Sequence, residues 1–140
     1  MIKDIYLLVG GEATRLRPLS EGIPKALLTI KGKLLIDLIL ANLDKSNLEN
    51  INLICSIKHE KFWLEYKKNS QFNVNLHFEH EKLDTAGFVV KNINNFNDKF
   101  LCMNGDLLIE MNFKSFLEVA NNSKNSTTVS YTHLTLPTKA

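Results

Sequence analysis

The sequence predicts an α/β protein in which a mostly parallel sheet carries helices on both faces. Short apolar runs rich in β-branched residues alternate with longer amphipathic runs as far as residue 121, which is the pattern of strand and helix repeats in such folds. The 140 residues suffice for one domain, and 44% hydrophobic and 23% charged residues are ordinary for a globular protein. Because such folds bind ligands at the carboxyl ends of their strands, functional residues are expected directly after the strands.

Four strands and four helices are expected along the chain. The strands cover residues 5–9, 51–57, 74–78 and 99–103. The helices cover residues 34–43, 58–69, 85–93 and 112–121. Near-continuous apolarity in the first helix predicts burial on more than one side. The residues that share its principal inward face are Leu35, Leu38, Ile39 and Leu43.

Aromatic side chains are prominent on the inward faces of two later helices. The second helix is expected to direct Phe62, Trp63 and Tyr66 toward the sheet. Aromatic residues at that spacing are more often part of a core than a stacking platform for a ligand. The last helix is amphipathic, and its expected inward residues are Phe113, Phe116, Leu117 and Ala120.

The segment after the first strand has the composition of an anion-binding loop. The apolar run over residues 5–9 stops at Gly10 and Gly11, and a polar stretch with Arg15 follows. Adjacent glycines allow positive φ and expose successive N–H groups without a Cβ, which suits the wrapping of a phosphate. The spacing fits neither the dinucleotide fingerprint nor the Walker A loop, because the next glycine is Gly22. Taken alone, the glycine pair favours a tight turn with solvated arginines.

The whole string is more specific than its glycines. GGEATRLRPLS followed by PKALL resembles the signature G-G-x-G-T-R-L-x-P-L-T…P-K-P-L of the sugar-1-phosphate nucleotidyltransferases, also called NDP-sugar pyrophosphorylases. The positions that match are Gly10, Gly11, Thr14, Arg15, Leu16, Pro18, Leu19, Pro24, Lys25 and Leu27. Two positions depart from the pattern: Ala13 replaces the usual third glycine, and Ala26 replaces a frequent proline. The resemblance implies a Rossmann-like layered sheet of the nucleotide-diphospho-sugar transferase type.

A second match lies at the end of the fourth strand. MNGDLLIEMNF, residues 103–113, looks like the family's Gly-Asp segment, and a carboxylate there could hold Mg²⁺ beside nucleotide phosphates. The resemblance makes Asp106 the metal ligand. The alternative is a β-hairpin, since Asn-Gly is a strong two-residue turn signal and LLIEM could be a return strand.

A third match covers EHEKLDTAG, residues 79–87. It resembles the family's E/Q…L-G-T-A-G segment, which lines the nucleobase pocket and opens a helix. Thr85, Ala86 and Gly87 match, whereas Asp84 replaces the usual glycine. Asp84 also suits the plain role of helix N-cap.

The resemblance implies an enzyme that forms an NDP-sugar and pyrophosphate from an NTP and a sugar 1-phosphate. In-line attack on the α-phosphate needs no protein nucleophile, because the attacking oxygen is already anionic. The implied catalytic residues are Arg15, which neutralises pyrophosphate, and Lys25, which screens the reacting phosphates, with Asp106 binding Mg²⁺. The implied nucleotide-binding residues are Gly10, Gly11, Thr14, Glu79, Asp84, Thr85 and Gly87. By analogy such enzymes supply activated sugars for bacterial surface polysaccharide or nucleotide-sugar metabolism. Assembly into a homo-oligomer is compatible with the sequence.

The alternative function is a catalytically silent module that binds a nucleotide, a sugar nucleotide or a partner subunit for regulation. Ala13 and Asp84 favour the silent module, because they depart from the family pattern. The presence together of Arg15, Lys25 and Asp106 favours the enzyme, since a module released from catalysis has little need of all three.

Composition and charge argue against other classes. A net charge of +2 with interspersed Lys and Glu leaves no basic stripe for nucleic acid. No run resembles a signal peptide or a membrane span, so a cytoplasmic location without membrane association is expected.

Cys55 and Cys102 fall in strand-like runs and are expected to be reduced core thiols. His59, His77 and His80 lack metal-site spacing and are expected to be surface or core histidines.

The last residues read differently from the rest. Residues 129–140, VSYTHLTLPTKA, continue no periodicity and closely resemble a translated sequencing adapter, which predicts a non-native tail. Residues 1–128 are therefore expected to form the N-terminal part of a nucleotidyltransferase domain, and the family pattern covers about residues 3–128, the first half of a typical member. On that expectation the chain is truncated, and a second metal-binding Asp and a sugar-phosphate Lys would belong to the missing half.

Overall fold

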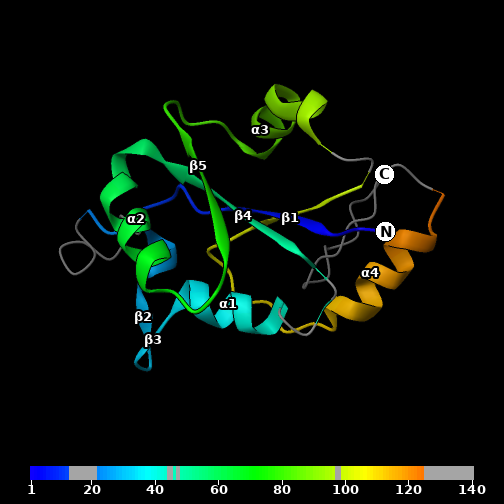
Figure 1. The fold of residues 1–140 in the computed structure, drawn as a ribbon, viewed down its shortest axis with the longest axis horizontal. Coiled ribbons are helices and arrows are strands. Elements are labelled where there is room, and N and C mark those ends of the chain that lie inside the picture. The colour runs from blue at the N-terminus through cyan, green and yellow to red at the C-terminus, as the bar shows by residue number, and fades with distance from the viewer. Residues whose placement is uncertain (13–21, 44–45, 47, 97–98, 125–140) are drawn as a thin grey trace, which may run out of the picture.

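The centre of the protein is a parallel four-stranded sheet (Figure 1). The computed structural model describes residues 1–12, 22–43, 46, 48–96 and 99–124. Within them the strand order is β5-β4-β1-β6, and each neighbouring pair is parallel. The strands are β1 (Asp4–Leu8), β4 (Asn50–Ser56), β5 (Val74–Glu79) and β6 (Leu101–Asn104). The predicted α/β class is confirmed.

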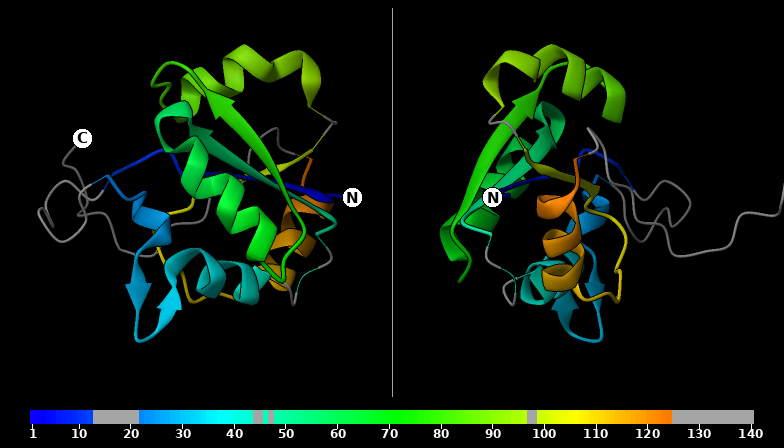
Figure 2. Two further views of the ribbon diagram at one scale, coloured as in Figure 1. Left: turned by 60° about the vertical axis from the view of Figure 1, so that its left-hand side comes forward. Right: turned by 90° about the vertical axis from the view of Figure 1, so that its right-hand side faces the viewer.

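Helices cover both faces of this sheet. The helices are α1 (Leu35–Leu43), α2 (Glu60–Asn69), α3 (Thr85–Asn92) and α4 (Phe113–Asn122). Figure 2 shows α3 on one side of the sheet and α1 and α4 on the other. The alternation of β1 explains the division, because Ile5 and Leu7 are buried in the core that includes α1, Trp63 and Phe113. Tyr6 points the opposite way and packs against Phe88 of α3, with ring centroids 5.7 Å apart.

The predicted elements agree with the structure to within about two residues at their ends. One inward residue is wrong: Phe62 on α2 is 41% exposed, while Trp63 and Tyr66 are buried. Leu38 and Phe116 are only half-buried. The hairpin alternative after Asn104 is also wrong, because no strand follows β6 among the described residues up to α4.

A short hairpin was not expected from the sequence. It joins β2 (Thr29–Ile30) to β3 (Lys33–Leu34) in an antiparallel pair, and its turn has positive φ at Lys31 (49°) and Gly32 (80°). Two successive positive φ values are typical of a type I′ turn, so the Lys-Gly pair was its sequence signal. Three 3-10 segments complete the described elements: η2 (Lys25–Leu27), η3 (Ile57–His59) and η4 (Ile93–Asn95).

Both cysteines carry free thiols, as expected. Cys55 lies fully within the core, and burial is the main cause that raises the pKa of its thiol, with the charge of Glu79 second. Burial likewise raises the pKa of Cys102. No helix in the described ranges combines the length and the apolar character needed to cross a membrane. The predicted tail, residues 129–140, lies outside the described residues and stays a prediction.

Candidate functional site

The carboxyl ends of all four parallel strands meet along one edge of the sheet. Glu79 at the end of β5 is the register partner of Ser56 at the end of β4. Gly10, two residues after β1, lies against Ser56, because a Cβ on Gly10 would be 3.6 Å from the Ser56 nitrogen. Gly105 follows β6, and its N–H donates to the Leu8 carbonyl at 2.9 Å. Every predicted site segment in the described ranges therefore begins on this edge.

Gly105 fixes the position of Asp106. Gly105 is buried against β1. A Cβ on Gly105 would overlap the Cγ1 of Val9 and approach the Leu8 carbonyl oxygen. A Cβ at this position would force Val9 or the chain after β6 to shift, so glycine suits the close approach to β1 at which its N–H bonds to Leu8. The turn therefore presents Asp106 at the edge directly beside the end of β1.

Gly10 and Gly11 differ from the expectation in one respect. Positive φ was expected to expose their N–H groups, but the described glycines with positive φ are Gly22 and Gly32. At Gly11 a Cβ would meet nothing within 4 Å, so this position borders open space. Its carbonyl accepts the N–H of Lys25 at 3.0 Å, which links the segment after β1 to the start of η2. Among the predicted residues, Thr14 and Arg15 lie outside the described residues.

Lys25 and Asp106 meet although 81 residues separate them in sequence. The Nζ of Lys25 lies 3.4 Å from Oδ2 of Asp106, and the side chains are 39% and 36% exposed. Two of the predicted site residues thus form a partly exposed ion pair at the carboxyl ends of the strands. Exposed pairs of this kind contribute about 0–1 kcal/mol to stability, so both side chains can exchange partners at low cost.

The segment predicted to line a nucleobase pocket runs from β5 into α3. Burial is the main cause that raises the pKa of Glu79, while the backbone N–H of Leu83 and the charge of Lys91 act in the opposite direction. The Oε1 atom of Glu79 is buried, and no described group hydrogen-bonds to it. Asp84 is exposed, and its carbonyl accepts the N–H of Phe88 at 2.9 Å as α3 begins.

The two remaining predicted residues of this segment lie within α3. Thr85 is its first residue. Gly87 lies against Leu83, where an added Cβ would make ordinary contact at 3.5 Å. Gly87 is therefore not required by packing in this structure.

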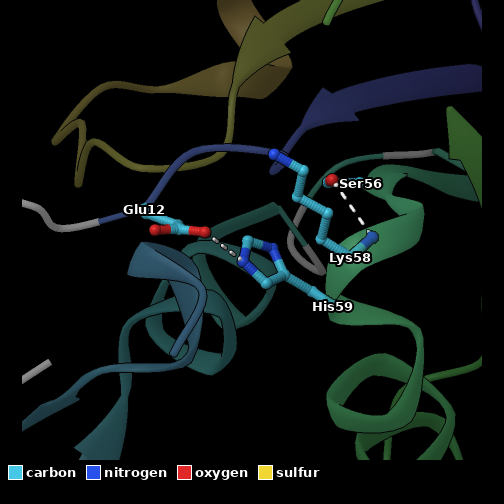
Figure 3. A network of polar contacts seen from close by, with 4 residues as sticks. All are labelled: Glu12, Ser56, Lys58 and His59. Atoms are coloured by element: carbon cyan, nitrogen blue, oxygen red, sulfur yellow. Dashed lines mark hydrogen bonds and ion pairs between the residues drawn. The ribbon is translucent and has the colours of Figure 1, made fainter. Parts of the chain in front are cut away.

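A contact that was not expected from the sequence joins the segment after β1 to the start of α2. His59, at the end of η3, is 3% exposed, and its Nε2 lies 3.1 Å from Oε1 of Glu12 (Figure 3). The sequence predicted a surface or core histidine, and the core position is the one observed. The missed signal is positional, because Glu12 and His59 both closely follow strands that neighbour each other in the sheet.

The acidic groups of the edge do not form a complete metal site by themselves. Within the described part of the chain, no group of three or more His, Cys, Asp and Glu side chains could hold a metal ion. Asp106 supplies one carboxylate, which is 36% exposed and lies beside the Lys25 ammonium group. That donor suits Mg²⁺, which binds through one or two carboxylates and takes its other ligands from substrate phosphates and water.

A parallel sheet with a glycine segment, a lysine and a carboxylate gathered at its carboxyl edge has the layout of α/β proteins that bind ligands at the ends of their strands. The family model described as nucleotidyl transferase matches residues 5–138. The chain belongs to this nucleotidyl transferase family, as the sequence resemblance indicated.

Three similar proteins illustrate the relationship. A mannose-1-phosphate guanyltransferase of Hypocrea jecorina is 30% identical over 139 residues, which cover 95% of this chain and 38% of that protein. The bifunctional protein GlmU of Methanococcus maripaludis is 33% identical over 118 residues, or 84% of this chain and 28% of that one. The crystal structure of HddC from Yersinia pseudotuberculosis complexed with GMP-PN superposes with a TM-score of 0.73 at 29% identity, over 86% of this chain and 55% of that one. The chain thus spans little more than half of these proteins at most.

Proposed function

We propose that this chain forms the nucleotide-binding part of an enzyme that makes an NDP-sugar and pyrophosphate from an NTP and a sugar 1-phosphate. The observation that carries the proposal is the meeting of Lys25 and Asp106 beside the Gly10–Gly11 segment. A cation, a carboxylate and a stretch of backbone without Cβ atoms are what two reacting phosphate groups require. The family membership supports the same reaction class.

In the proposed reaction an oxygen of the sugar phosphate attacks the α-phosphorus of the nucleotide. A new P–O bond forms on one side while the bond to the β-phosphate oxygen breaks on the other, and pyrophosphate leaves with that electron pair. The barrier lies in bringing anions together. Lys25 reduces it by neutralising charge on the phosphates, and Gly11 leaves the space through which they approach.

Magnesium enters this proposal through Asp106. When bound, it supplies positive charge between the phosphates and helps the leaving group depart. Asp106 would hold the ion, and Gly105 keeps that carboxylate at the edge by its backbone bond to Leu8. Lys25 lies close enough to Asp106 to offset the charge of its carboxylate while no ion is bound.

GTP is the first nucleotide to test, because a relative is named mannose-1-phosphate guanyltransferase and the HddC structure carries GMP-PN. Binding of GTP to the 140-residue chain would be measured by calorimetry with and without Mg²⁺. We expect Lys25→Met to weaken binding by about tenfold or more, the worth of one charge-assisted hydrogen bond. Asp106→Asn should remove the part of the affinity that depends on Mg²⁺.

Lys3→Met is the matched control. Lys3 forms an exposed ion pair with Glu49, 2.9 Å from Nζ to Oε1, at the opposite edge of the sheet. The substitution makes the same charge change and should leave GTP binding unaltered. GTP binding that ignores Mg²⁺, Lys25→Met and Asp106→Asn alike would favour the catalytically silent module instead.

A further inference from the structure

We propose that His59 is a positioning residue that holds the glycine segment in place through Glu12 and so determines where Lys25 lies. The placement of the segment is argued from this structure alone. Its consequence for phosphate binding rests on the function proposed above.

The contact between the two residues is partly buried and joins distant parts of the chain. His59 Nε2 lies 3.1 Å from Glu12 Oε1 across 47 positions of sequence. The His59 side chain is 3% exposed and that of Glu12 is 29% exposed, so the ring is shielded from water while the carboxylate is partly solvated. Figure 3 shows the His59 ring, at the start of α2, pointing toward the carboxylate of Glu12 in the segment after β1.

The ring offers this contact and no other polar one in the described part of the chain. Its Nδ1 is buried without a hydrogen-bond partner. Because Nε2 faces a carboxylate oxygen, the ring hydrogen belongs on Nε2, where it donates to Glu12. A buried ring nitrogen without a partner costs about 1–3 kcal/mol, which an apolar side chain would avoid. A histidine at this position is therefore explained better by its hold on Glu12 than by packing.

Glu12 in turn is tied to the segment that carries Lys25. It forms an isolated antiparallel bridge with Pro24, and the neighbouring Gly11 carbonyl accepts the N–H of Lys25 at 3.0 Å. A displacement of Glu12 would therefore move the start of η2. Lys25 Nζ reaches Asp106 from that position, so the chain of contacts runs from His59 to the proposed phosphate-binding pair.

Hydrogen exchange at the Lys25 amide tests the positioning directly. His59→Phe keeps a ring and removes the donor, whereas His59→Gln keeps a side-chain N–H that can reach Glu12. In the 140-residue chain we expect His59→Phe to speed exchange at Lys25 by about tenfold, and His59→Gln to restore most of the protection. The Val9 amide, which donates to Ile54 in the sheet, should change far less and corrects for any loss of global stability.

Tyr66→Phe is the matched control. The Tyr66 hydroxyl donates to Asp37 at 2.7 Å, so this variant also loses a hydrogen bond made from the α2 region, but away from the edge. It should leave the Lys25 exchange rate unchanged relative to Val9. Unchanged relative exchange in His59→Phe, or equal acceleration in Tyr66→Phe, would overturn the proposal.

Binding of inorganic pyrophosphate with Mg²⁺ tests the functional consequence by calorimetry. We expect His59→Phe to weaken it by about tenfold in the parent chain and by less than about twofold in a Lys25→Met background, because the effect acts through Lys25. Equal weakening in both backgrounds would refute that route. If the parent chain bound neither pyrophosphate nor GTP, the proposed function would fail, and the exchange data would still decide the role of His59.

Discussion

Replacing Gly105 by alanine should destabilise the fold through one identifiable overlap. The added Cβ would overlap the Val9 Cγ1 and also approach the Leu8 carbonyl oxygen. Overpacking of a rigid core typically costs about 1–3 kcal/mol. The loss of glycine freedom in the unfolded chain offsets about 0.4–1 kcal/mol of that cost. The net expectation is a free energy of unfolding lower by about 1–2 kcal/mol, measured by urea denaturation.

Two further variants show whether the overlap is the cause. Gly11→Ala is the matched control, because a Cβ there meets nothing within 4 Å and no positive φ opposes it. It should change the free energy of unfolding by no more than about 1 kcal/mol in either direction. Val9→Ala removes the overlapped methyl, so Gly105→Ala should cost less in that background than in the parent chain. Equal denaturation midpoints for Gly105→Ala and Gly11→Ala would refute the packing argument.

Two other features give measurable expectations. The Asn112 side chain caps α4 by accepting the N–H of Ser115 at 3.0 Å. Asn112→Ala should therefore lower the free energy of unfolding by about 1 kcal/mol, while Asn112→Ser should retain most of the stabilisation by the cap. Equal denaturation midpoints for the two variants would contradict the cap. Burial lowers the pKa of His77 from its ordinary 6.5, so His77 should titrate below that value in an NMR titration. Because the folded pKa is the lower one, the free energy of unfolding should fall as the pH drops from 6.5 through the folded pKa, and His77→Gln should flatten that dependence. A His77 midpoint at or above 6.5 would show that burial does not govern its titration.

The order and type of the main elements could be predicted because apolar periodicity reports burial directly. The continuous apolar run of β1 and the amphipathic pattern of α4 could be recognised without knowledge of their neighbours. Phe62 shows the limit of that reasoning. It and Trp63 are adjacent on α2 and lie about 100° apart around the helix, so both cannot face the same core. Which one is buried depends on what α2 packs against, and a single sequence does not state this.

The candidate site was predictable in part for a related reason. Lys25 and Asp106 follow different strands, and parallel strands bring their carboxyl ends to one edge whatever the details of packing. The contact of Glu12 with His59 depends in addition on how far two side chains reach across that edge. The role of Gly105 depends on how closely β6 approaches β1, which pattern analysis does not measure.

The positions of Lys25 and Asp106 are set by backbone hydrogen bonds and not by the ion pair between their side chains. Their ion pair is 3.4 Å long and more than a third exposed on both sides, so it is too weak to fix either residue. Asp106 is instead placed by Gly105, whose backbone bonds to β1, and Lys25 by the Gly11 carbonyl. In the proposed reaction each charge can therefore leave the other for a phosphate or a metal ion without disturbing the backbone. In that proposed reaction the pair would keep the two opposite charges neutralised until a substrate replaced it, while the backbone positions of both residues stay fixed.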